Sequence, residues 1–272
     1  MIELGLLGYP LEHSFSPALH EAALRASGLD GRYSLYPVVR GDAVSLRDLV
    51  GRVRTGELRG LNVTIPHKQA IIPFLDGLTA TARAVGAVNT IYLQEGRVWG
   101  DNTDTAGFAA DLHKLGPTSG PALVLGAGGA ARAVIHCLRS MGWAVTIAAR
   151  RREQARELAD QFAGVEALLL DAPGLQNARA GLIVNATPAG MFPDIEACPW
   201  PRGAPFPEEA AVYDLVYNPP ETRLVREARA AGLRARSGLG MLIEQAALAF
   251  ELWTGRKVER EVLHNVLAHI IR

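Results

Sequence analysis

The stretch from residue 122 to residue 140 places the strongest limits on how this chain can fold. Residues 122–125 are apolar and predict a strand, residues 129–140 have the pattern of a helix, and between them lies Gly126-Ala-Gly128-Gly129-Ala-Ala131. A Gly-x-Gly-x-x-Gly/Ala motif in this context is typical of dinucleotide-binding domains, where the glycines permit a tight turn and a close approach of backbone amides to a pyrophosphate. A glycine-rich turn that binds nothing is the alternative, and we favour dinucleotide binding.

Strand-like and helix-like segments alternate on both sides of this motif, and 272 residues are enough for two domains. We therefore predict an α/β protein of two lobes. In the first half, strands are expected at residues 2–7, 32–38 and 61–65, helices at 17–26, 43–53 and 105–115, and a hairpin around Glu95-Gly96. In the second half, strands are expected at 122–125 and 144–149 and near Leu168, Leu182 and Val212, and helices at 129–140, 153–162, 238–253 and 258–271. The loop Gly116-Pro-Thr-Ser-Gly120 is the predicted seam between the lobes.

Charge and cysteine content exclude several classes of function. The chain has 28 basic and 28 acidic residues, so no bulk field favours nucleic acid or an anionic membrane. Its two cysteines, Cys137 and Cys198, belong to no CxxC or Cys/His cluster, and no metal site is expected. Residues 2–8 read as a strand without a basic n-region, and no charge-free apolar stretch is long enough to span a bilayer, so neither a leader nor a membrane span is expected. We expect a cytoplasmic protein whose partner is a small molecule.

The end of the second strand after the glycine-rich motif indicates which dinucleotide is bound. NAD-binding domains place an acidic residue there for the ribose hydroxyls. This chain instead has Ala149-Arg150-Arg151-Arg152, and guanidinium groups attract the extra 2′-phosphate of NADP. A solvated helix start is the alternative role for these arginines. Three cations at a helix N-terminus oppose the helix dipole, which favours an anionic partner and therefore NADP.

Lys68 is one of only three lysines in a chain that has 25 arginines. Arginine cannot release its proton, so a retained lysine is a candidate for proton transfer. Residues 62–65 read as a β-branched strand, Pro66 as the first helical position and Lys68 as part of the first helical turn, where a cation faces the unfavourable end of the dipole. A solvated surface lysine is the alternative, and other motifs must decide.

Asp104 lies where a strand-like segment leads into a helix, so it can serve as a helix cap. Asn102 and Thr103 can cap the same helix end, so one of the three side chains is available for chemistry. A carboxylate near Lys68 would hold its ammonium group and couple the two titrations.

Several further polar residues have both a structural and a ligand-binding interpretation. Ser16 precedes Pro17 and is a plausible N-cap, but Ser14 and Ser16 together also make a small cradle for a carboxylate. Asn62, Thr64 and Asn89 need hydrogen-bonding partners if they are buried, which a polyhydroxylated ligand or the neighbouring backbone would supply. His67 is interpreted as a helix-start residue rather than a base.

Taken together and in order, the motifs of this chain resemble those of the shikimate dehydrogenase family over nearly the whole length. The matching segments are Gly8-Tyr-Pro-Leu-Glu-His-Ser-Phe-Ser-Pro17, Asn62-Val-Thr-Ile-Pro-His-Lys68, Gly86-Ala-Val-Asn-Thr90, Gly100-Asp-Asn-Thr-Asp104, Gly126-Ala-Gly-Gly-Ala-Ala131, Asn185-Ala-Thr-Pro-Ala-Gly-Met191, Asp214-Leu-Val-Tyr-Asn-Pro219 and Gly238-Leu-Gly-Met-Leu-Ile-Glu-Gln245. Each segment alone is weakly specific, and the ordered set is highly specific.

The resemblance implies an oxidoreductase that reversibly reduces 3-dehydroshikimate to shikimate with NADPH, on the route to chorismate and the aromatic amino acids. It implies a catalytic lobe, residues 1–102 and 238–272, with a mixed, mostly parallel sheet. Residues 103–237 would form a Rossmann-like NADP-binding lobe, with the C-terminal helices returning to the first lobe. A monomer or a homodimer is expected.

The resemblance also assigns roles to individual residues. Lys68 and Asp104 would be the catalytic pair. Substrate-binding residues would be Ser14, Ser16, Asn62, Thr64, Asn89, Tyr217 and Gln245. Cofactor-binding residues would be Gly126, Ala127, Gly128, Gly129, Ala130, Arg150, Arg151, Thr187, Leu215, Gly238 and Met241.

The chain departs from the family pattern at the arginine cluster, where NADP-using relatives commonly have Asn-Arg-Thr or Asn-Arg-Ser in place of Ala149-Arg150-Arg151. The change removes two hydrogen-bonding side chains near the ribose and phosphate, and Arg151 can compensate electrostatically. A quinate/shikimate dehydrogenase that tolerates NAD is therefore the second enzymatic hypothesis. A cofactor-binding sensor without turnover is the hypothesis from another class.

Overall fold

The computed structural model describes residues 1–116, 119–175 and 179–271, and the chain divides into two compact units. Unit 1 comprises Met1–Gly107 and Ile243–Arg272, and unit 2 comprises Phe108–Leu242. The chain passes between them within two helices, α4 (Thr103–Leu112) and α9 (Leu239–Thr254). The predicted seam at 116–120 is wrong, because that segment belongs to unit 2; residues 117 and 118 lie outside the described residues.

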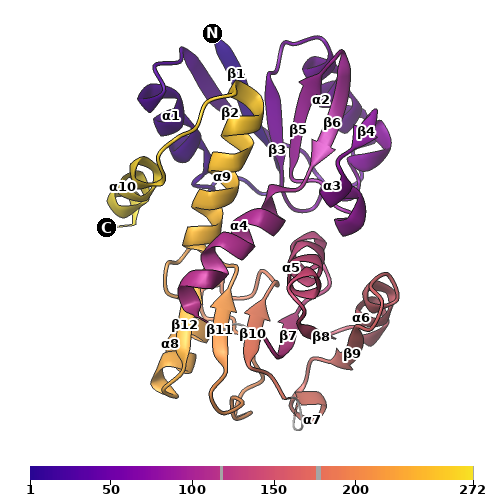
Figure 1. Ribbon diagram of the computed structural model, residues 1–272, viewed down its shortest axis with the longest axis vertical. Coiled ribbons are helices and arrows are strands. Elements are labelled where there is room, and N and C mark those ends of the chain that lie inside the picture. Colours follow the sequence, from indigo (N-terminus) through magenta and orange to yellow (C-terminus); the bar gives the residue numbers. More distant parts are fainter. Residues whose placement is uncertain (117–118, 176–178, 272) are drawn as a thin grey trace. The chain divides into compact units, whose positions relative to one another are not determined.

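Unit 1 is built on a mixed sheet of six strands (Figure 1). The strands are β1 (Ile2–Gly8), β2 (Gly31–Pro37), β3 (Gly60–Val63), β4 (Gly77–Leu78), β5 (Thr90–Gln94) and β6 (Arg97–Asp101), in the order β2-β1-β3-β5-β6-β4. Only β5 is antiparallel to its neighbours. The predicted hairpin is confirmed: Glu95 and Gly96, both with positive φ, join β5 to β6, as a tight hairpin turn requires.

The helices of unit 1 are α1 (Ser16–Ala26), α2 (Ala43–Arg54), α3 (Ala80–Val85), the short 3₁₀ turn η1 (Ile72–Phe74), the later part of α9, and α10 (Arg260–Ile270). Asp42 starts α2 by accepting a hydrogen bond from the Ser45 amide. Trp253 of α9 donates its indole N–H to Ile91 O at 2.9 Å, and a Cβ at Gly60 would overlap the indole ring. Gly60 therefore lets the returning C-terminal helix pack directly on β3, as the resemblance implied.

Unit 2 is a parallel sheet of six strands in the order β12-β11-β10-β7-β8-β9, the order of a Rossmann fold. The strands are β7 (Pro121–Leu125), β8 (Ala144–Ala149), β9 (Glu166–Leu169), β10 (Leu182–Asn185), β11 (Ala211–Asp214) and β12 (Arg234–Ser237). The helices are η2 (His113–Leu115), α5 (Gly129–Ser140), α6 (Arg152–Ala159), α7 (Ala172–Leu175) and α8 (Arg223–Ala230). Val124 points into one hydrophobic core, and its neighbours Leu123 and Leu125 point into another. Alternate residues thus fill cores on the two faces of the sheet.

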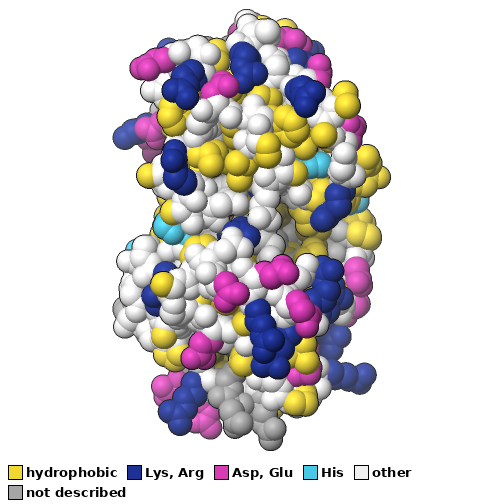
Figure 2. All heavy atoms as spheres, turned by 90° about the vertical axis from the view of Figure 1, so that its right-hand side faces the viewer, with side chains coloured by type: hydrophobic (Ala, Val, Ile, Leu, Met, Phe, Trp, Pro, Cys, Tyr) yellow, Lys and Arg dark blue, Asp and Glu magenta, His cyan; other side chains and the backbone are white. Residues whose placement is uncertain are grey.

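Basic and acidic side chains are interspersed on the molecular face in Figure 2, so that face carries no broad region of one sign. In the described part of the chain, no helix combines the length and the apolar character needed to cross a membrane.

Candidate active site

The two residues predicted to be catalytic are in contact in unit 1. Lys68 Nζ lies 2.5 Å from Asp104 Oδ2, although 36 positions separate the residues in sequence. The side chains are 16% and 8% exposed, so the pair is shielded but still accessible. Charge-assisted hydrogen bonds are short, and partial burial strengthens them. The solvated-surface interpretation of Lys68 is therefore wrong.

The sheet order explains why these residues meet. Lys68 follows the carboxyl end of β3, and Asp104 follows the carboxyl end of β6. Because β5 runs antiparallel between them, its amino end, preceded by Asn89, lies at the same edge. Three segments far apart in sequence thus place polar side chains at one edge of the sheet.

The local structure predicted around Lys68 is wrong. Strand β3 ends at Val63, and residues 65–71 form turns and a loop rather than a helix. Tertiary contacts hold this segment instead: buried His67 hydrogen-bonds Val38 O through Nε2 at 2.6 Å, and Lys68 O accepts from the Val88 amide at 2.7 Å. The helix-dipole argument for Lys68 therefore does not apply. His67 has a structural role, but not as a helix start.

Asp104 is not the cap of helix α4. Asn102 Oδ1 accepts from the Thr105 amide at 3.2 Å and so serves as the cap. The Asp104 carboxylate instead accepts from Lys68 and, through Oδ1, from Asn89 Nδ2 at 2.9 Å. The surplus of capping side chains in the sequence thus leaves Asp104 facing the lysine.

Two asparagines expected to bind substrate hydroxyls are engaged within unit 1. Asn89 Nδ2 donates to both Thr103 Oγ1 and Asp104 Oδ1 at 2.9 Å, and its Oδ1 accepts from the Thr103 amide at 2.8 Å. Asn62 Oδ1 accepts from Tyr33 at 2.8 Å, and its Nδ2 lies 3.3 Å from Asn89 O. Both amides thus have protein partners, and Asn89 directly orients the Asp104 carboxylate.

The remaining substrate-binding candidates fall in both units. Ser16 is the buried first residue of α1 and not its N-cap, a position that Phe15 occupies; Ser14 Oγ accepts from the Ser16 amide at 3.2 Å. Thr64 follows β3, and a Cβ at Gly8 would overlap its methyl group, so Thr64 lies against the carboxyl end of β1. Gln245 is buried in the part of α9 that belongs to unit 1. Tyr217, in contrast, follows β11 in unit 2.

The glycine-rich loop of unit 2 has the geometry of a phosphate-binding turn. Gly126 has φ +107°, and a Cβ there would lie 2.9 Å from the Thr187 methyl carbon, so glycine is required on both counts. Gly128 is the N-cap of α5 and provides no capping side chain, while a Cβ there would meet no atom of the described residues within 4 Å. The amides at the start of α5, around Gly129 and Ala130, are thus free of a side-chain cap and suited to an anion.

The loops after β7 and β10 meet where the strand order of the sheet reverses, the usual ligand site of such sheets. Gly126 and Ala127 follow β7, and Thr187 follows β10. Arg150, Arg151 and Arg152 at the start of α6 are exposed, and none forms an ion pair with a described residue. These residues fit a phosphorylated dinucleotide.

The third group of cofactor candidates lies at the carboxyl ends of β11 and β12. A Cβ at Gly238 would overlap the carbonyl oxygen of Leu215, so the two backbones touch. Met241 is buried in the core of unit 2. Leu215, Gly238 and Met241 therefore form one packed group.

Three family models match this chain in sequence order. The model for the shikimate dehydrogenase substrate binding domain matches residues 6–91, that for shikimate/quinate 5-dehydrogenase matches residues 113–191, and that for the shikimate 5′-dehydrogenase C-terminal domain matches residues 238–268. The chain belongs to the shikimate dehydrogenase family.

Relatives in the shikimate dehydrogenase family match nearly end to end. The shikimate dehydrogenase (NADP(+)) of Salinibacter ruber is 45% identical over 274 residues, 96% of this chain and 95% of the relative. The crystal structure of shikimate 5-dehydrogenase from Thermus thermophilus, in complex with NADP(H) and shikimate, is 42% identical with a TM-score of 0.88 and covers 99% of each chain. The enzyme from Listeria monocytogenes, in complex with shikimate and NAD, is 32% identical with a TM-score of 0.86, covering 98% of this chain and 96% of that one.

Two buried polar residues of this shikimate dehydrogenase family member escaped the sequence-based assignment. Asn185 Oδ1 accepts from Thr187 Oγ1 at 2.7 Å, and Asn185 Nδ2 donates to Asp214 Oδ1 at 2.8 Å. Asp214 Oδ2 accepts from Thr222 at 2.6 Å, and burial raises the pKa of Asp214 to about 6. Asn185 and Asp214 are the polar last residues of otherwise apolar strands, a pattern in the sequence that could have indicated them. Together they tie the Thr187 loop to the end of β11.

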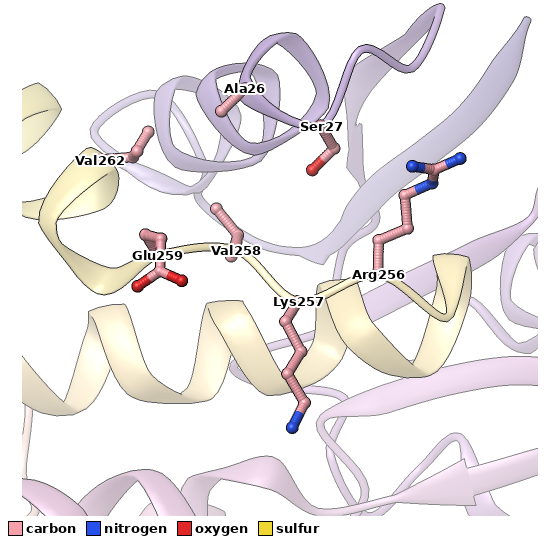
Figure 3. Close-up of a pocket in the computed structure, with 7 residues that line it drawn as sticks. All are labelled: Ala26, Ser27, Arg256, Lys257, Val258, Glu259 and Val262. Atoms are coloured by element: carbon pink, nitrogen blue, oxygen red, sulfur yellow. The ribbon is translucent and has the colours of Figure 1, made fainter.

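Unit 1 also has a pocket of about 460 Å³ between the end of α1 and the connection from α9 to α10 (Figure 3). Its lining residues are Ala26, Ser27, Arg256, Lys257, Val258, Glu259 and Val262, none of which was predicted as a site residue.

In the described residues, no group of three or more His, Cys, Asp or Glu side chains is arranged to hold a metal ion.

Proposed function

We propose that this chain is an NADP-dependent shikimate dehydrogenase, which reversibly reduces 3-dehydroshikimate to shikimate in aromatic amino acid biosynthesis. The contact between Lys68 Nζ and Asp104 Oδ2 carries the proposal, because it supplies a shielded proton donor held by a carboxylate. NADPH, when bound, supplies the hydride.

In this mechanism Lys68 donates the proton to the alkoxide oxygen that develops as the substrate carbonyl is reduced. Asp104 holds the ammonium group in position, and Asn89 holds Asp104 through its 2.9 Å hydrogen bond. A positioned acid of this kind contributes about 10² to 10⁴ in rate. In the reverse direction, neutral Lys68 accepts the proton of the shikimate hydroxyl.

The substrate set belongs to the same proposal. Ser14, Ser16 and Thr64 bind the carboxylate of the substrate, and Asn62, Asn89 and Gln245 face its hydroxyl groups. Because the amides of Asn62 and Asn89 already have protein partners, direct binding by them requires exchange of a hydrogen bond or use of a second acceptor lone pair. Tyr217, which lies in unit 2, belongs to the same predicted set of substrate-binding residues.

Residues 103–237 would form the NADP-binding domain, and residues 1–102 with 238–272 the substrate-binding domain. Gly126, Ala127, Gly128, Gly129 and Ala130 would hold the pyrophosphate, since the start of α5 has no side-chain cap. Arg150 and Arg151 would hold the 2′-phosphate. Thr187, Leu215, Gly238 and Met241 would line the nicotinamide end.

The second candidate is an enzyme that also accepts NAD and quinate. The relative from Listeria monocytogenes was crystallised with NAD, and this chain lacks the Asn and Thr side chains that usually flank Arg150. The exposed arginines, which form no ion pair with any residue that the structure describes, favour NADP.

Steady-state rates on shikimate and on quinate, each with NADP⁺ and with NAD⁺, test the proposal. We expect the highest kcat/KM for shikimate with NADP⁺. A higher kcat/KM with NAD⁺, or on quinate, would support the second candidate. Tight NADP⁺ binding with no oxidation of shikimate would instead indicate a cofactor-binding sensor. The cytoplasmic location and the monomeric or homodimeric state remain predictions.

A further inference from the structure

Helix α4 carries a second buried aspartate, Asp111, about two turns after Asp104 and within unit 2. Its side chain is 0% exposed. Arg236 donates to it from Nε at 2.9 Å and from Nη2 at 2.8 Å, and Tyr213 donates to Oδ2 at 2.8 Å. Lys114 Nζ lies 3.5 Å from Oδ1. No function assigned so far uses this cluster.

The Asp111 carboxylate also lies directly against the first turn of α9. A Cβ at Gly240 would overlap all three atoms of the carboxylate group. Gly240 does not have the positive φ that would by itself call for glycine, so the close approach is what excludes a side chain there. An anion at this end of a helix is favourable, because the helix dipole is positive at its N-terminus.

The residues around the contact between Asp111 and Gly240 lie next to Leu215, Gly238 and Met241, which are predicted to line the nicotinamide end of the cofactor. Tyr213 lies on β11 and precedes Leu215, just beyond the strand, by two positions. Arg236 lies on β12 and likewise precedes Gly238, just beyond that strand, by two positions. Gly238 touches Leu215, and Met241 follows Gly240. The Asp111 carboxylate therefore contacts the ends of β11 and β12 and the first turn of α9, the three segments that carry Leu215, Gly238 and Met241.

We propose that Asp111 is a positioning residue for the nicotinamide end of the cofactor, acting through Gly240 on Gly238 and Met241. The proposal rests on the proposed function. A buried ion pair adds little net stability compared with apolar residues of the same volume, whereas its directional bonds fix geometry. A misplacement of about 1 Å at a reacting group can lower a rate about 10²-fold, so small shifts of this turn matter.

The main test is Gly240→Ala in the full-length chain, with Gly181→Ala as the matched control. Among the described residues, a Cβ at Gly181 would meet only Pro121 O at 3.8 Å, an ordinary contact in the same unit. We expect Gly240→Ala to raise the Kd for NADP⁺, measured by calorimetry, and the KM for NADP⁺ about tenfold or more, with the KM for shikimate within about twofold. Gly181→Ala should leave all three values unchanged.

A second variant keeps the test decisive if Gly240→Ala fails to fold. Asp111→Asn preserves the shape of the side chain but weakens its bonds to Arg236 and Tyr213, and it should also raise the Kd for NADP⁺. In an Asp111→Ala background the overlap with the carboxylate is gone, so adding Gly240→Ala should change the Kd for NADP⁺ little further.

The proposal is overturned if Asp111→Asn lowers the urea midpoint but leaves the Kd and KM for NADP⁺ unchanged, since the cluster would then serve only fold stability. Equal increases in the KM for NADP⁺ and for shikimate would also overturn it. Failure of the proposed function gives a different result, because the unaltered chain would then not bind NADP⁺ or oxidise shikimate.

Discussion

The two buried aspartates of α4 differ in their nearest cationic partner, which is Lys68 for Asp104 and Arg236 for Asp111. Asp104, in unit 1, pairs with a lysine that remains 16% exposed, and an asparagine holds its other oxygen. Asp111, in unit 2, receives two hydrogen bonds from one arginine and one from a tyrosine and is fully enclosed. Arginine cannot release a proton, whereas lysine can. The first pair is therefore suited to proton transfer, and the second to holding backbone segments in place.

The largest expected effect tests the lysine of the first pair. Lys68→Ala should lower kcat by about 10² to 10⁴, because the proton donor is removed. Lys68→Arg should be similarly impaired, since it retains charge but cannot give up its proton. Lys257→Ala, which changes an exposed lysine of the same unit, is the matched control. Normal turnover of a folded Lys68→Ala protein would contradict the assignment of proton transfer to the pair of Lys68 and Asp104.

The next effect concerns how acid changes the stability of the two units. Burial lowers the pKa of His20, in unit 1, from 6.5 to about 3, and raises the pKa of Asp214, in unit 2, from 3.8 to about 6. The stability due to His20 is present above pH 6.5 and is lost as the pH falls toward 3. The stability due to Asp214 is present below pH 3.8 and is lost as the pH rises through about 6.

Each of these groups should change the free energy of unfolding by about 3 kcal/mol over two pH units, with opposite signs. Urea unfolding at about pH 7 and about pH 4.5 measures both effects. As the pH falls, the unaltered chain should lose stability relative to His20→Phe and gain stability relative to Asp214→Asn. Changes of the same sign in both comparisons would contradict this account.

The smallest effect compares a buried tyrosine from each unit. Tyr213 donates to the charged Asp111, and Tyr33 donates to the neutral amide oxygen of Asn62, both at 2.8 Å. Tyr213→Phe should lower the free energy of unfolding by about 2 kcal/mol and Tyr33→Phe by about 1 kcal/mol, because hydrogen bonds to charged groups are stronger. Chemical denaturation gives both values, and a larger loss for Tyr33→Phe would reverse the expected order.

Most of the elements could be predicted from the sequence because their signals are local. The ranges predicted for α5 and β8 match the observed ones, and the hairpin lies where Glu95-Gly96 indicated. The turn at Lys68 was missed because His67 and Val88, which hold it, make contacts that no local pattern reveals. The short helix α8 and strand β12 were not predicted at all.

By itself, the sequence determined the alternation of strands and helices, the glycine-rich turn and the presence of a lysine and an aspartate suited to proton transfer. Only the tertiary structure decided that Asn102, and not Asp104, caps α4, and that the units divide within two helices. It also decided that the Asp111 carboxylate packs directly against Gly240. Periodicity and turn chemistry depend on neighbouring residues, whereas these features depend on the order of strands in the sheets. That order brings together residues such as Asp111 and Tyr213, which are 102 positions apart.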